Sequence, residues 1–263
     1  MKEIKILHLL PRLLSLYGEY GNVAVLEKFL REAGCDVTVT GWEKGALDLS
    51  GFDFIYVGSG TEDNLLEAVK RLAPHADAVA ASIQGGQHWL ATGNAMSLFG
   101  KSITRKGVET AALGCFGYTT EFNEQKRFLG DAVTAPLFGA PCIGFINNSC
   151  IYRGIDAPLL ELVLNPQLGN DKASNQDGTT AANFRGTQLI GPVLVKNPHF
   201  LCAVMEAITG APVTLGEDEY FLMGDNRDNS NDSRSRSVGP IQRSEIVGEV
   251  KFVFFPFNSI RGI

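Results

Sequence analysis

The sequence lacks any apolar run approaching the roughly 20 residues that a membrane-spanning helix requires. It also lacks a basic excess, because 23 Lys and Arg stand against 29 Asp and Glu, for a formal net charge of −6. This acidic balance disfavours nucleic acid and anionic membranes as partners. Residues 1–11 contain no small-residue cleavage site of the kind that ends a signal peptide. We therefore expect a cytoplasmic protein with no membrane span and no nucleic-acid partner.

Cysteine is scarce and irregularly placed. The five cysteines are odd in number and lack the short spacings of metal sites: Cys35, Cys115, Cys142, Cys150 and Cys202. Scattered thiols of this kind are typical of a reducing compartment, where most behave as small buried hydrophobic residues. We therefore expect free thiols, no bound metal and no cofactor.

The first hundred residues alternate between strand-like and helix-like segments. Residues 4–10 and 53–57 are apolar runs of the kind found in parallel strands covered on both faces. Residues 23–33 and 62–72 have apolar positions at helical spacing, and Asn22 is expected to cap the first of these helices. The alternation predicts a doubly wound α/β domain, in which ligands bind beyond the carboxyl ends of the strands.

Residues 87–100 predict an apolar strand, a sharp turn at Gly93 and Asn94, and a short helix closed by Gly100. A strand-to-helix elbow of this kind commonly lifts a nucleophile above a parallel sheet, but no Cys or Ser stands at this tip. The earlier loop Gly58-Ser59-Gly60 also follows a buried strand, and its backbone N–H groups are suited to an anion. A plain tight connection is the alternative. We expect both turns at one sheet edge, with these candidate binding residues: Gly58, Ser59, Gly60, Thr92 and Asn94.

The pattern changes after residue 101. Four segments are predicted to be extended: 114–120, 126–133, 142–149 and 186–198, the last with a bend at Gly191-Pro192. A polar loop occupies residues 169–180, and a helix is predicted from Pro198 to about residue 208.

Five separated motifs occur in the order found in CobB/CobQ-like class I glutamine amidotransferases, and the chain resembles that family through them: Leu16–Asn22, Val57–Gly60, Leu90–Gly100, Gly144–Asn147 and Gly186–Pro198. The resemblance is strongest to the amidotransferase subunit of lipid II isoglutaminyl synthase, the MurT/GatD pair. It implies a three-layer, flavodoxin-like domain over residues 1–210 and a Mur-ligase-like protein partner.

The resemblance also shows which chemistry to look for. Enzymes of this family hydrolyse glutamine with a Cys nucleophile and a His base, and alignment of the motifs places Gly93 at the Cys position and Ile190 at the His position. Neither residue can perform the reaction. We therefore predict a non-hydrolysing binding or partner subunit without catalytic residues. An active amidotransferase with a displaced Cys nucleophile remains an alternative, although His88 and His199 are expected in core or capping roles.

The C-terminal segment has a different pattern. Residues 220–234 resemble the last sequence box of type I signal peptidases, and the likeness continues through the apolar residues 250–257. In that family the positions matching Ser230, Asp232 and Arg234 support a Ser–Lys dyad, whose own two sequence boxes do not occur here. The sequence therefore predicts a second, short β-rich domain over residues 211–263. A signal-peptidase-class serine endopeptidase is the alternative function that rests on this motif.

Overall fold

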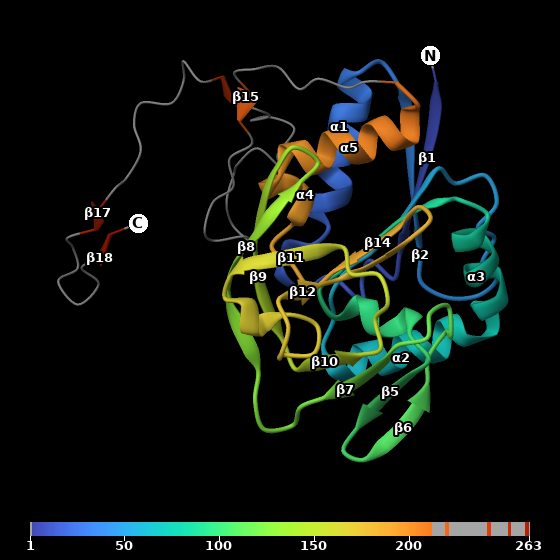
Figure 1. Cartoon of the computed structure of the whole chain (residues 1–263). Coiled ribbons are helices and arrows are strands. Elements are labelled where there is room, and N and C mark those ends of the chain that lie inside the picture. The colour runs from blue at the N-terminus through green and yellow to red at the C-terminus, as the bar shows by residue number, and fades with distance from the viewer. Residues whose placement is uncertain (1, 212–218, 221–240, 243–251, 254–260, 263) are drawn as a thin grey trace. The chain divides into compact units, whose positions relative to one another are not determined.

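A computed structural model describes residues 2–211, 219–220, 241–242, 252–253 and 261–262 (Figure 1). The chain divides into two compact units, Met1–Val213 and Thr214–Ile263. The described part of the second unit consists of two short antiparallel pairs: β15 (Glu219–Tyr220) with β16 (Ile241–Gln242), and β17 (Phe252–Val253) with β18 (Arg261–Gly262). These residues have the β character that the sequence predicted for the appendage.

A six-stranded sheet forms the centre of the first unit, with the order β13-β14-β4-β3-β1-β2. Its strands are β1 (Glu3–Leu9), β2 (Asp36–Trp42), β3 (Phe54–Val57), β4 (His88–Thr92), β13 (Thr179–Ala181) and β14 (Phe184–Thr187). All neighbours pair in parallel except β13, which pairs with β14 in the antiparallel sense. The predicted doubly wound parallel sheet is confirmed.

Helices cover both faces of this sheet. One face packs against α2 (Glu62–Leu72) and α3 (Ala76–Gln84), whose apolar residues join those of β1, β3 and β4 in one buried cluster. A second helical group consists of α1 (Gly21–Glu32), α4 (Val193–Lys196) and α5 (Pro198–Thr209), which contact one another (Figure 1). The result is a helix–sheet–helix arrangement, as expected for a flavodoxin-like domain.

Two smaller sheets follow the elbow. The first has the order β10-β7-β5-β6, with β5 (Ser102–Arg105), β6 (Val108–Ala111), β7 (Thr119–Phe122) and β10 (Cys150–Arg153). The second has the order β12-β11-β8-β9, with β8 (Phe128–Leu137), β9 (Ala140–Asn148), β11 (Leu160–Leu164) and β12 (Gln176–Asp177). Short 3-10 helices complete the unit: η1 (Leu16–Gly18), η2 (Ala73–His75), η3 (Gly93–Phe99) and η4 (Pro166–Leu168).

Two local predictions were wrong for one shared reason. Asn22 does not cap α1, because Tyr20 is the N-cap and the Asn22 side chain is buried within the helix. The extended segment predicted over 186–198 ends as a strand at Thr187, and residues 193–196 form α4 instead. The backbone N–H of Leu194 donates to Asn22 Oδ1 at 2.8 Å, so a contact between distant residues overrides the strand preference of the Val-Leu-Val run.

Candidate functional site at the crest of the parallel sheet

Three loops follow the carboxyl ends of β3, β4 and β14, and we call residues 58–61, 92–94 and 188–192 the crest. Asn94 joins two of them, since its Nδ2 donates to the Gly60 carbonyl at 2.7 Å and its Oδ1 accepts from the Gly60 N–H at 3.1 Å. Ser59 Oγ donates to the Thr92 carbonyl at 3.3 Å. The two turns predicted to share a sheet edge therefore lie in direct contact, and the Gly60 N–H is already used within the crest.

The position expected for a nucleophile faces the position expected for its base. Gly93 has φ +62°, the left-handed conformation that favours glycine, so the backbone forms a sharp elbow at this residue. A Cβ atom added at Gly93 would overlap Ser59 Oγ and lie 2.8 Å from Ile190 Cγ2. Ile190 is held in place by Phe145, whose carbonyl accepts its N–H at 2.8 Å. The space between these two positions is therefore filled by Ser59 and Ile190.

A buried carboxyl group, which the sequence analysis missed, lies directly beneath the crest. Glu19 is completely buried; it accepts a hydrogen bond from the Gly191 N–H at 2.9 Å, and its Oε2 is hydrogen-bonded to the Tyr56 hydroxyl at 3.1 Å and to Thr92 Oγ1. Burial raises the pKa of Glu19 to about 7, against the lowering effect of these hydrogen bonds and of the Lys196 charge. The available signal was a single acidic residue within the motif of residues 16–22, between Gly18 and Gly21.

Two further polar residues contact Tyr56. Asn22 Nδ2 donates to its hydroxyl at 3.0 Å, so Asn22 links α1, β3 and α4. The ring of His8, on β1, meets the Tyr56 ring edge-on at 5.1 Å between centroids. His8 is 6% exposed, its Nε2 has no hydrogen-bond partner, and burial lowers its pKa to about 4. A neutral histidine therefore belongs to the polar group under the crest.

One thiol and one imidazole lie within reach of each other away from the crest. Cys142 Sγ, on β9, is 3.4 Å from Nε2 of His199, near the start of α5. Burial raises the pKa of Cys142 to about 11 and lowers the pKa of His199. A catalytic thiolate needs the opposite shift, so burial favours the neutral form of both groups near pH 7. Burial likewise raises the pKa values of Cys115 and Cys150 to about 11.

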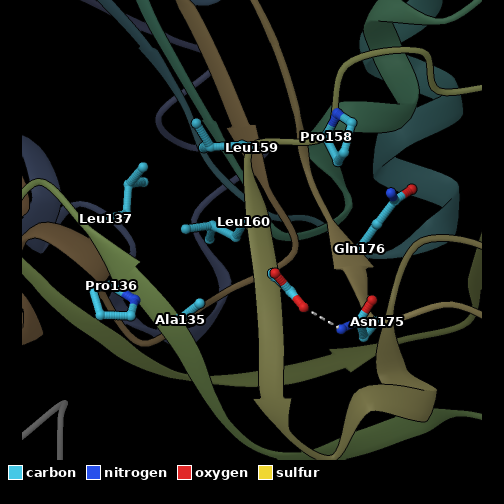
Figure 2. A pocket seen from close by; sticks show the side chains of 9 residues that line it. Ala135, Pro136, Leu137, Pro158, Leu159, Leu160, Asn175 and Gln176 are labelled. Carbon is cyan, nitrogen blue, oxygen red and sulfur yellow. Dashed lines mark hydrogen bonds between the residues drawn. The ribbon is translucent and has the colours of Figure 1, made fainter.

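Open cavities also lie on the described part of the first unit. One, of about 410 Å³, lies between the end of β8 and the start of β11, with Leu137, Leu159 and Leu160 on its wall (Figure 2). A hydrogen bond of 2.9 Å from Asn175 Nδ2 to Glu161 Oε1 crosses one side of it. Another cavity, of about 230 Å³, is bordered by Glu62, the first residue of α2, and by Arg127.

The predicted signal-peptidase-like positions Ser230, Asp232 and Arg234 lie outside the described residues. Across the part of the chain that is described, no helix has the length and apolar character needed to cross a bilayer. Within those same residues, no three or more His, Cys, Asp or Glu side chains are grouped to hold a metal ion.

Known proteins are similar to this chain over most of its length, in sequence and in fold. The GatD subunit of lipid II isoglutaminyl synthase (glutamine-hydrolyzing) from Staphylococcus aureus is 26% identical over 199 residues, which is 75% of this chain and 81% of that protein. A crystal structure of glutamine amidotransferase covers 77% of this chain with a TM-score of 0.50 and 14% identity. PurLQS from Thermotoga maritima covers 80% with a TM-score of 0.51, also at 14% identity.

The fold is that of class I glutamine amidotransferases. The sequence has a second similarity toward its C-terminus, because the family model for signal peptidase, peptidase S26, matches residues 164–255. Signal peptidase I of Bacillus licheniformis is 41% identical over 96 residues, and signal peptidase I T of Bacillus subtilis is 45% identical over 80 residues. The chain spans about half the length of the first of these relatives and 41% of the second.

Proposed function

We propose that residues 1–210 form a non-hydrolysing, amidotransferase-like subunit that acts by binding a partner, a Mur-ligase-like protein engaged in amidation of the cell-wall precursor lipid II. Residues 211–263 are proposed to be a separate signal-peptidase-like segment. The observation that carries the proposal is the closed crest. Gly93 and Ile190 face each other, and the Ser59 hydroxyl occupies the space that a side chain at residue 93 would need.

Two independent features argue against hydrolysis at this site. Glycine and isoleucine offer neither a nucleophile nor a proton acceptor, and removal of both groups typically costs many orders of magnitude in rate. Ser59 also blocks the position from which a nucleophile would attack. The similarity to GatD, a protein named as a subunit, supports a role that depends on a second chain.

The deciding experiment is a glutaminase assay on the purified full chain, with and without a Mur-ligase-like partner. We expect no glutamine hydrolysis in either case, together with partner binding measured by calorimetry. Cys142→Ser serves as the control variant, because Cys142 is the thiol nearest a histidine. Hydrolysis by the wild-type chain would overturn the proposal, and its loss in Cys142→Ser would assign the activity to a displaced nucleophile.

A series of variants tests whether Ser59 blocks the crest, in addition to the crest lacking a nucleophile and a base. Gly93→Cys with Ile190→His restores the two side-chain types but leaves Ser59 in place, so we expect no activity. Adding Ser59→Gly removes the obstruction, and glutamine hydrolysis should become detectable if the elbow is otherwise intact. Circular dichroism on both variants checks that they fold. Equal, measurable hydrolysis by the two variants would show that Ser59 does not block the crest.

Signal-peptidase activity is the second candidate function, and the match over residues 164–255 is the observation that favours it. It requires a nucleophilic Ser and a Lys base, and Ser230 stands at a supporting position in the motif. We expect the full chain to leave a signal-peptide substrate uncleaved. Cleavage that is lost on substituting a single Ser and a single Lys would establish this candidate instead.

A further inference from the structure

Three oxygen atoms form a closed ring beneath the crest. The Tyr56 hydroxyl oxygen lies 3.1 Å from Glu19 Oε2 and 2.8 Å from Thr92 Oγ1, and Thr92 Oγ1 is itself hydrogen-bonded to Glu19 Oε2. All three residues are completely buried. Each oxygen therefore contacts the other two, and three such contacts require three hydrogen atoms if none is to be repulsive.

The hydrogen count of the ring depends on the state of Glu19. Tyr56 and Thr92 supply one hydroxyl hydrogen each. Asn22 Nδ2 donates to Tyr56 from outside the ring, so it adds no hydrogen to the contacts between the three oxygens. A carboxylate supplies none, which would leave one contact between two oxygens without a hydrogen. A carboxylic acid supplies the third and completes the ring.

We propose that Glu19 is held as a neutral carboxylic acid whose proton closes this ring, making the junction of β3 and β4 beneath the crest a proton-dependent latch. The second oxygen of Glu19 fits the same assignment, because Oε1 accepts the Gly191 N–H at 2.9 Å as the carbonyl oxygen of an acid does. Loss of the proton removes one edge of the ring next to Gly93. The latch is independent of whether the chain hydrolyses glutamine.

The charged and titratable groups around the ring set the pH at which Glu19 loses its proton and the latch opens. Burial raises the pKa of Glu19 to about 7, while the Lys196 ammonium on α4 favours the ionised form. Burial and the nearby Glu19 carboxyl raise the pKa of Tyr56 well above its usual value, so Tyr56 keeps its hydrogen. His8, on β1, faces Tyr56 and is neutral at pH 7 because burial lowers its pKa. The latch therefore closes below neutrality and opens above it.

The test compares urea unfolding of the full wild-type chain and of Glu19→Gln between pH 4 and pH 8. Glutamine is neutral, keeps a carbonyl for the Gly191 N–H and supplies hydrogens toward Tyr56 and Thr92. The measured quantity is the equilibrium constant for unfolding of the wild type divided by that of the variant. Because His8 is present in both proteins, its titration cancels from this ratio. We expect this ratio to rise by about tenfold per pH unit between pH 4.5 and 7, and then to level off.

Glu62→Gln is the matched control at the edge of the crest. Burial opposes ionisation of Glu62, but hydrogen bonds from its own N–H and from Ser149, with the Arg127 charge, lower its pKa overall. The corresponding ratio for this variant should stay constant between pH 4.5 and 7. A constant ratio for Glu19→Gln, or one that falls as the pH rises, would show that Glu19 is a carboxylate and overturn the latch.

A spectroscopic measurement keeps the proposal testable even if Glu19→Gln folds poorly. The infrared spectrum of the wild-type chain, in deuterated buffer near pH 6, should contain the carbonyl band of a buried carboxylic acid. That band should lose intensity as the pH is raised through 7. A spectrum with carboxylate bands alone at pH 6 would contradict the assignment.

Discussion

At the scale of single residues, Gly93 gives the sharpest prediction. Gly93→Ala places a methyl group in a left-handed conformation and against Ser59 and Ile190. Gly18→Ala is the matched control, because Gly18 has φ +72° and nothing within 4 Å of an added Cβ atom. We expect Gly18→Ala to lose about 1 kcal/mol of unfolding free energy and Gly93→Ala about 1–3 kcal/mol more, measured by urea denaturation. Equal losses would mean that the crest has room at Gly93.

Single positions could be predicted from the sequence only where a motif aligned them. Counting along two motifs gives Gly93 and Ile190 as the positions of a nucleophile and a base, and these roles stay a prediction; in the structure, a Cβ atom added at Gly93 would lie 2.8 Å from Ile190 Cγ2. The role of Glu19 could not be predicted in this way. Its partners Tyr56, Thr92 and Gly191 are 37, 73 and 172 residues away in sequence, and only the folded chain shows that the carboxyl group is buried.

At the scale of structural elements, Asn94 fastens the loop after β3 to the elbow after β4. Asn94→Ala would remove both of its hydrogen bonds to Gly60 and leave buried backbone groups without partners. We expect a loss of about 2–4 kcal/mol of unfolding free energy. Asn175→Ala is the control, since Asn175 makes an exposed bond to Glu161 and its loss should cost about 0.5 kcal/mol or less. Similar losses in the two variants would contradict a fastening role.

The parallel core could be predicted because its signals are local. The apolar strands and the amphipathic helices between β1 and β4 can each be recognised from a window of about ten residues. The two smaller sheets, one mixed and one antiparallel, could be predicted only in part, as extended segments, since pairings such as β10 with β7 join distant residues. The short helix α4 was missed because a bond from Leu194 to Asn22, 172 residues away, stabilises it.

At the scale of the whole molecule, two buried groups act on stability in opposite directions. The pKa of His8 is lowered from 6.5 to about 4 by burial, so stability is lost as the pH falls from 6.5 to 4. The pKa of Glu19 is raised from 4.5 to about 7, so stability is lost as the pH rises from 4.5 to 7. Each shift corresponds to about 3 kcal/mol, and the two windows overlap. Between pH 4.5 and 6.5 their opposed contributions to the free energy of unfolding therefore offset each other. The net charge of −6 alone does not indicate this balance.

Removing one of these two groups should expose the effect of the other. His8→Leu removes an imidazole whose burial, beside Tyr56, lowers its pKa to about 4. Relative to the wild type, this variant should gain about 3 kcal/mol of unfolding free energy at pH 4 compared with pH 7. Urea denaturation at intervals between these pH values measures the difference. A His8→Leu curve parallel to the wild type would mean that His8 has the same pKa in the folded protein as in the unfolded chain, and that its burial does not oppose protonation.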